Sequence, residues 1–190
     1  MKTKHKLILA AALAFAVTRA ALAEPTAFEL IKKGNDYVGI QSKDKVLQIH
    51  SDKSVATLTP NIWHVLYYDP DAPFKSVEVK FGAGQEMAVS HPPRAFAPPY
   101  SEREIFDPSK LKVDSDRALK LALEQPLLKA LTLKASKLTL ESGDTGLVWK
   151  VQLWAAKLKK PEAQADIGVV ILSATDGSVV KNDLRPNKVD

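Results

Sequence analysis

Two short stretches of this 190-residue chain resemble one another, and this internal repeat constrains the fold more than any single motif does. The first reads Ile62-Trp63-His64-Val65, and the second, about 86 residues later, reads Val148-Trp149-Lys150-Val151. A short amphipathic helical pattern precedes each tryptophan, and β-rich runs with a glycine turn follow it. Because internal self-similarity indicates a repeated architecture, we expect two related α+β units.

The first 23 residues have the pattern of a secretory signal peptide. Lysines precede an apolar run from Leu7 to Val17, and Ala21-Leu22-Ala23 forms a small-x-small cleavage site. The apolar run is shorter than the roughly 20 residues that span a bilayer as a helix. We therefore expect cleavage after Ala23, a periplasmic or secreted protein, and no membrane insertion once the signal is removed. A retained membrane anchor is the alternative.

Loss of the signal peptide would remove most of the excess positive charge. The whole chain carries 27 basic and 22 acidic residues, and the signal region holds four of the basic ones and no acidic one. The mature chain would keep 23 basic residues against 22 acidic ones. Nucleic acid is therefore not expected as a partner. The remaining lysine cluster, at Lys157, Lys159 and Lys160, is predicted to be a solvated turn.

The chain contains no cysteine. In an exported protein this excludes disulfide bonds, a thiol nucleophile, cysteine-ligated metals and the lipid-attachment cysteine of bacterial lipoproteins. Stability must therefore come from packed hydrophobic cores.

The first predicted unit covers residues 24–90. Thr26 can cap a short helix that ends at Gly34-Asn35. Strand signals follow at 37–40, 45–50, 62–68, 75–81 and 87–90. The turn before the last of these, Gly82-Ala83-Gly84, is explained by hairpin geometry rather than by phosphate binding.

A proline-rich segment, residues 91–109, separates the two predicted units. Its two Pro-Pro pairs, Pro92-Pro93 and Pro98-Pro99, remove backbone donors and favour an extended chain. We interpret the segment as a semi-rigid linker. Recognition of this stretch by a groove on a partner is the alternative.

The second predicted unit covers residues 110–190. Asp114 or Ser115 can cap a clearer helix, which Pro126 either kinks or splits. Strand signals follow at 134–141, 147–154 and 167–172, and the hairpin sequence Thr175-Asp176-Gly177-Ser178 leads into a last strand at Val179-Val180. The predicted fold class is therefore α+β, with two similar units, each a helix packed on an antiparallel meander sheet.

Three elements of the second unit together resemble a PepSY-type domain. They are the helix introduced by Val113-Asp114-Ser115-Asp116, the strand Val148-Trp149-Lys150-Val151, and the terminal turn Thr175-Asp176-Gly177-Ser178. The match covers roughly residues 114–183, and the first unit is similar. The resemblance implies a small exported domain of a kind found in proregions of secreted proteases and as free-standing periplasmic proteins, with roles in inhibition or binding. It brings no catalytic residues.

No catalytic, cofactor-binding or metal-binding residue is predicted from the sequence. The mature histidines, His50, His64 and His91, are isolated, so a metal site would need distant strands to converge. Asp69-Pro70-Asp71 indicates a turn, since the further ligands of a calcium loop are missing. The three tryptophans are expected in the core rather than on a binding surface: Trp63, Trp149 and Trp154.

The favoured function is a non-catalytic binding or inhibitory module that acts on a protein or peptide partner in the bacterial envelope, without a cofactor. This hypothesis predicts an exposed apolar or edge-strand patch and no cluster of perturbed ionisable groups. The alternative, a hydrolytic or metal-assisted periplasmic enzyme, requires convergence of at least two of a small set of residues. That set is His50, His64, His91, Asp69, Glu86 and Asp107. An envelope spacer would show neither a pocket nor an apolar patch.

Overall fold

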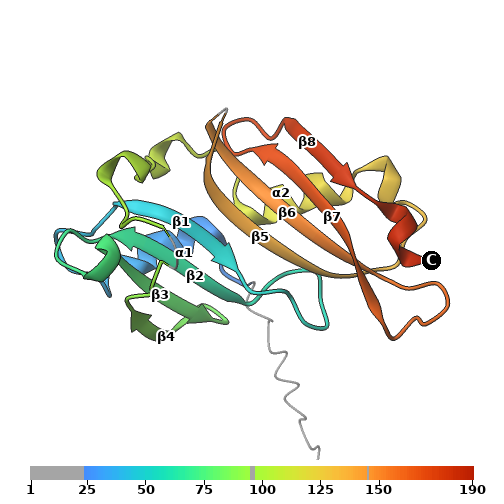
Figure 1. Ribbon diagram of the computed structural model, residues 1–190, viewed down its shortest axis with the longest axis horizontal. Coiled ribbons are helices and arrows are strands. Elements are labelled where there is room, and N and C mark those ends of the chain that lie inside the picture. The colour runs from blue at the N-terminus through green and yellow to red at the C-terminus, as the bar shows by residue number, and fades with distance from the viewer. Residues whose placement is uncertain (1–23, 95–96, 145) are drawn as a thin grey trace, which may run out of the picture.

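The computed structural model describes residues 24–94, 97–144 and 146–190, so the predicted signal peptide lies outside the described residues. Within them, eight antiparallel strands form one continuous sheet, in the order β4-β3-β2-β1-β5-β6-β7-β8 (Figure 1). The strands are β1 Val46–Ser51, β2 Ile62–Tyr68, β3 Ser76–Gly82, β4 Gln85–Ser90, β5 Leu133–Gly143, β6 Gly146–Ala156, β7 Gln164–Ser173 and β8 Val179–Leu184.

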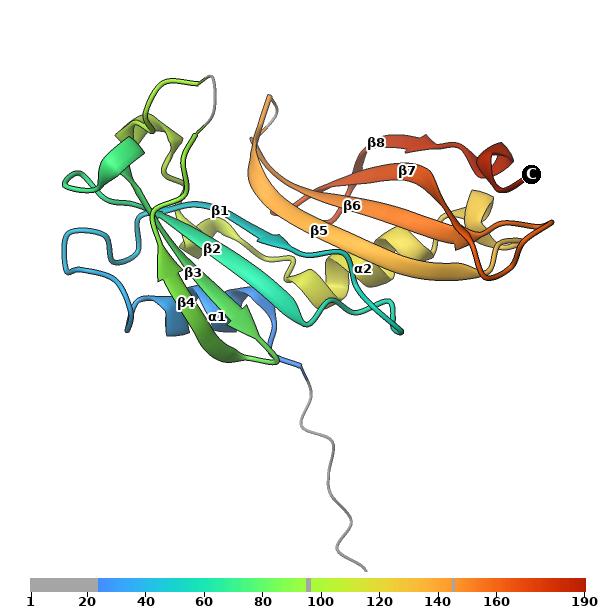
Figure 2. The same ribbon diagram turned by 60° about the horizontal axis from the view of Figure 1, so that its bottom comes forward.

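Two short helices lie on the same face of this sheet (Figure 2). Helix α1, Ala27–Gly34, packs on β1 and β2, and helix α2, Ser115–Leu123, packs on β6 and β7. In the described ranges, five 3₁₀ turns complete the regular structure: η1 Pro73–Lys75, η2 Glu102–Glu104, η3 Pro108–Lys110, η4 Pro126–Leu128 and η5 Pro186–Val189. No helix in the described part of the chain is long and apolar enough to span a membrane.

The prediction of two units, each a helix on its own sheet, is wrong. The order of one helix followed by four strands does occur twice along the chain. However, β1 pairs with β5, with Ile49 opposite Leu140 and His50 opposite Thr139, so both sets of strands belong to one sheet. The fold is sheet-rich, and its main core includes residues from both halves of the chain. Pairing the inner edges satisfies backbone groups that two separate sheets would leave open.

Buried serines reinforce this junction of β1 with β5, which we call the seam. Ser51 Oγ accepts the backbone N–H of Leu138, and Ser54 Oγ accepts that of Ser136, each at 2.9 Å. Ser136 Oγ in turn donates to the carbonyl oxygen of Leu58 at 2.6 Å. Polar side chains at these buried positions are tolerated because they complete hydrogen bonds that the short β1–β5 ladder leaves unmade.

The ends of the two helices are also tied together. Thr26 caps α1 in a capping box with Glu29, which confirms the predicted cap. Asp114 caps α2 by accepting the N–H of Ser115, and it also accepts the N–H of Phe28 at 3.2 Å. Helix α2 ends at Leu123, and Pro126 begins η4, so the proline lies beyond the helix.

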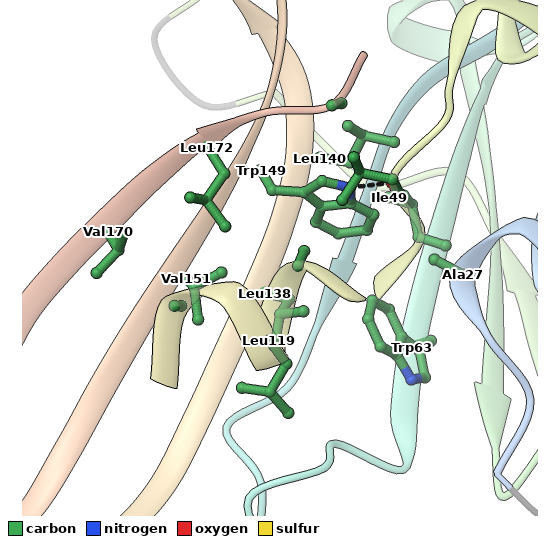
Figure 3. Close-up of a cluster of buried hydrophobic side chains, with 14 of the residues drawn as sticks. Ala27, Ile49, Trp63, Leu119, Leu138, Leu140, Trp149, Val151, Val170 and Leu172 are labelled. Carbon is green, nitrogen blue, oxygen red and sulfur yellow. Dashed lines mark hydrogen bonds between the residues drawn. The ribbon is translucent and has the colours of Figure 1, made fainter. Parts of the chain in front are cut away.

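The repeated tryptophans occupy equivalent strands, β2 and β6, and both are buried, as predicted. The indole N–H of Trp149 donates to the carbonyl oxygen of Val113 at 2.8 Å (Figure 3), and that of Trp63 donates to Pro60 at 3.2 Å. Trp154 is only partly buried, and Lys53 Nζ lies 4.6 Å from its ring centroid.

The predicted strand at 37–40 is wrong, because this stretch is a series of turns. The N–H of Tyr37 bonds to Gly34, and that of Ser42 bonds to Gly39, so the backbone groups are satisfied locally. The ring of Tyr37 packs edge-on against Phe81, at 6.1 Å between centroids. An apolar loop residue that packs on the sheet thus gave a false strand signal.

Candidate functional site

The face of the sheet opposite the helices carries a row of polar side chains. Strand register places Lys80, His64, His50, Thr139 and Lys150 side by side across β3, β2, β1, β5 and β6. Side chains in a strand alternate between faces, and the neighbours of these residues point into the core. The middle of the helix-free face is therefore lined by imidazole, hydroxyl and ammonium groups.

Two histidines and a glutamate converge in the middle of this row. The imidazole rings of His50 and His64 are stacked, with centroids 4.7 Å apart and planes within 5°. His64 Nδ1 lies 3.0 Å from Glu78 Oε1, on the adjacent strand β3. Each of the three residues offers a ligand atom within 4.8 Å of those of the other two. We call His50, His64 and Glu78 the histidine cluster.

A second carboxylate approaches His64 from the other side. Asp52 follows directly after β1, and its Oδ1 lies 3.3 Å from His64 Nε2. The side chain of His64 is 13% exposed, whereas that of Asp52 is 49% exposed. Each ring nitrogen of His64 therefore faces a carboxylate oxygen.

Burial and mutual contact perturb the ionisation of the cluster. Burial, and then the neighbouring His64, lower the pKa of His50 below its usual value. The hydrogen bond with His64 lowers the pKa of Glu78, and this effect exceeds the opposing effect of burial. Near neutral pH His50 is thus favoured as a neutral imidazole and Glu78 as a carboxylate. The binding hypothesis had predicted no such cluster, so that expectation is wrong.

A shallow hollow of about 440 Å³ lies farther along the same face, over β5 to β8. Its lining is mixed in charge: Lys137, Thr139, Lys150, Gln152, Asp166, Gly168, Val169, Asp183, Arg185 and Lys188. Several of these groups bind each other, as Gln152 does with Asp166 at 2.7 Å and Arg185 with Asp183 at 3.3 Å. The lining keeps an excess of basic side chains, four against two acidic ones, although both acidic groups already have partners.

The proline-rich segment packs over another part of the helix-free face. Tyr100 and Ile105 contact a small apolar cluster formed by Leu47, Leu66 and Tyr68. The N–H of Phe106 bonds to the carbonyl oxygen of Val46, which anchors the segment beside β1.

The outer strand β4 exposes apolar side chains at the rim of the sheet. Met87 is 57% exposed and Val89 is 44% exposed. Val89 lies opposite Val79, whose side chain is buried in the core, so Val89 extends the apolar face beyond the cover of α1. Within the residues that the structure describes, β3 is the one strand that pairs with β4.

The residues named by the enzyme hypothesis are only partly brought together. His50 and His64 converge, but His91 is exposed beyond the end of β4, and Glu86 lies on β4 itself. Asp69 accepts the N–H of Asp71 in the predicted turn, at 3.0 Å. Asp107 accepts the N–H of Ser109 at the start of η3. The lysine cluster at 157–160 is exposed and irregular, as expected for a solvated turn.

Sequence reasoning missed Glu78 and Asp52. A usable signal exists for the histidines, because His50 and His64 each sit between two core positions of a strand. That alternation places both on the polar face of any sheet the strands form. The signal for Glu78 is the same alternation in β3, but nothing local reveals that its strand lies next to His64.

Comparison of the chain with protein-family models, curated proteins and solved structures found no match. The resemblance to a PepSY-type domain therefore stays a prediction.

Proposed function

We propose that the protein is an exported, non-catalytic binding or inhibitory module that takes an extended segment of a protein or peptide partner along the outer edge of β4. The observation that carries this proposal is the exposed apolar rim formed by Met87 and Val89 on that edge. An added strand would hydrogen bond to the free backbone groups of β4, and its side chains would cover this rim.

The edge of β4 is lightly protected: it carries one charged residue, Glu86, and an irregularity in its pairing with β3. Natural sheets place lysine or proline on exposed edges, or cover them with another segment. Residues Gln85–Ser90 contain neither lysine nor proline. The opposite edge, β8, contains Lys181, and Asn182 bonds to Gln125 of the segment that follows α2. We therefore place the partner on β4 rather than on β8.

The surroundings of β4 favour an apolar partner segment. Phe81, on the neighbouring strand, is fully buried and packs against the partly exposed Tyr37. Lys33 Nζ donates to the carbonyl oxygen of Gly84 at 2.6 Å, which holds the β3–β4 turn against α1. A preformed strand edge has little ordering cost on binding. Side chains of the added strand on the helix side would contact Val89, which lies opposite Val79, and those on the other face would contact Met87, whose side chain lies over Gly82.

The test is affinity capture from envelope extract with the chain from Glu24 to Asp190. The variant carries Met87→Lys and Val89→Lys, which place two charges on the rim at exposed positions. The matched control carries Val179→Lys and Val180→Lys, at exposed positions on β8. We expect the wild type and the control to retain the same proteins and the β4 variant to lose them. Equal retention by all three proteins would contradict the β4 site.

The second candidate is a hydrolytic or metal-assisted enzyme, and the convergence of His50 and His64 favours it. It predicts turnover of peptide or ester substrates that a chelator and the variant His64→Ala both abolish. Activity that survives in the His64→Ala variant would argue against this role for the cluster.

A further inference from the structure

We propose that the histidine cluster binds a divalent transition-metal ion of the Zn²⁺ type, with His50, His64 and Glu78 as ligands and Asp52 as the group that orients His64. This site is separate from the proposed edge of β4 and does not depend on it.

The first step concerns the contact between His64 and Glu78. In a zinc site the carboxylate oxygen and the imidazole nitrogen each lie about 2.0–2.1 Å from the metal, which places these two ligand atoms about 3–3.4 Å from one another. Nδ1 of His64 and Oε1 of Glu78 are 3.0 Å apart. The two atoms that now share a proton are thus spaced as two ligands of one metal ion would be. An ion on the ring nitrogen would replace that proton, and the Glu78 oxygen would shift off the N–H axis to bind it.

The second step concerns the other nitrogen of His64. When Nδ1 binds the metal, the imidazole proton resides on Nε2. That proton can then be donated to Asp52 Oδ1, which is 3.3 Å away. A carboxylate that accepts the second N–H of a metal-bound histidine fixes the ring and raises its basicity. In the structure the two atoms make no hydrogen bond, so a turn of the half-exposed Asp52 side chain is needed for Asp52 to take this role.

The third ligand is His50. Its Nδ1 is buried and has no hydrogen-bond partner in the part of the chain that the structure describes. A buried polar nitrogen without a partner carries a free-energy cost that a metal bond would remove. Because the ligand atom of His50 lies within 4.8 Å of the others, binding requires the ring to leave its stack and move by roughly 1 Å.

The surroundings set the metal type and the charge. Two imidazoles and a carboxylate, without a thiolate, suit Zn²⁺, Cu²⁺ or Ni²⁺ better than Ca²⁺ or Mg²⁺. Glu78 and Asp52 supply negative charge, while Lys80 and Lys137 oppose it, each acting on one member of the cluster. Three protein ligands on a partly open face leave a coordination position for water or a partner atom.

The test is calorimetric titration of the chain from Glu24 to Asp190 with ZnCl₂ near neutral pH, with MgCl₂ as a second probe. We expect one Zn²⁺ per chain and no Mg²⁺ binding. His50→Gln and Glu78→Gln should each weaken Zn²⁺ binding by about tenfold or more. His91→Gln is the matched control, because His91 is exposed and lies outside the cluster, and it should leave the affinity unchanged.

A second measurement follows the histidine ring signals by NMR during the titration. Signals of His50 and His64 should shift together at one equivalent of Zn²⁺, while those of His91 stay in place. The proposal is overturned if the wild type takes up no stoichiometric Zn²⁺, or if His50→Gln binds as tightly as the wild type. The variant Met87→Lys with Val89→Lys should keep its Zn²⁺ affinity, which separates this site from the edge of β4.

Discussion

Removal of one hydroxyl group at the seam should destabilise the whole molecule. Ser51 is fully buried at the end of β1, and its Oγ accepts the N–H of Leu138 on β5 at 2.9 Å. In the variant Ser51→Ala that N–H keeps its buried position and loses its acceptor. A buried backbone donor left without a partner costs about 1–3 kcal/mol. We therefore expect the free energy of unfolding to fall by about 1–3 kcal/mol.

A matched substitution separates this effect from the general cost of losing a serine. Ser109 is exposed, and its hydroxyl bonds to the exposed side chain of Asp107. Water can replace that bond, so Ser109→Ala should change stability by less than about 0.5 kcal/mol. The difference between the two variants isolates the buried bond across the seam.

The assay is urea unfolding followed by tryptophan fluorescence and by far-ultraviolet circular dichroism. Because both halves contribute to one sheet and one main core, the two signals should give one coincident transition, and Ser51→Ala should shift all of it. The reasoning is refuted if Ser51→Ala is as mild as Ser109→Ala. It is also refuted if unfolding shows two separate transitions, since the halves would then be stable on their own.

Two further predictions concern backbone conformation and pH. Gly168→Ala should lower the free energy of unfolding by about 2 kcal/mol or more, because φ at this position is +104° and the new Cβ would collide with the carbonyl oxygen of Asp183. The control is Gly146→Ala, where φ is +116° and no atom lies within 4 Å of the new Cβ. It should lower the free energy of unfolding by less in the same urea assay. Hydrogen bonds from the N–H and hydroxyl of Ser178 lower the pKa of Asp176 to about 2, so its carboxyl carbon should titrate there by NMR. Because this pKa is lower in the folded than in the unfolded state, the carboxylate stabilises the fold fully above the unfolded-state pKa of about 3.9, and that stabilisation is lost as the pH falls through about 2. In the variant Asp176→Asn the free energy of unfolding should therefore depend less on pH between these two values. A carboxyl that titrates near the unfolded-state value would contradict the turn contacts.

Much of the local structure could be predicted because its signals are local. The tryptophan repeat does mark equivalent buried strands, β2 and β6. The cap at Asp114 and the hairpin after β7 also follow from residue types at fixed offsets. Each of these features depends on neighbours a few residues away, which a single sequence displays directly.

The joining of the halves could not be predicted in the same way. Ile49 and Leu140 alternate with polar residues, and that alternation is the same in an edge strand as in a central one. The buried serines at positions 51 and 136 would ordinarily indicate solvent exposure. Their burial is explained only by partners about 80 to 90 residues away, such as Leu138 for Ser51.

The histidine cluster depends on strand register in the same way. His50 faces His64 because β1 and β2 pair in one particular alignment. A slip of one residue would move either side chain to the opposite face of the sheet. The spacing of the histidines in the sequence therefore shows no metal-site pattern. The alternation of apolar and polar residues around each histidine does, however, indicate correctly that it lies on the polar face of its strand.

The seam also determines where binding can occur on this molecule. Pairing of β1 with β5 removes the inner edges of both halves, so an added strand must use an outer edge of the sheet. The same pairing places His50 in the middle of the sheet instead of at an exposed rim. Three consecutive residues contribute to both the seam and the proposed metal site. Ser51 points into the core and accepts the N–H of Leu138, whereas His50 and Asp52 point to the opposite face beside His64. Loosening the seam therefore displaces two members of the proposed metal site at once. Ser51→Ala should consequently weaken Zn²⁺ binding while leaving capture at β4 intact, because β4 lies three strands away from the seam strand β1.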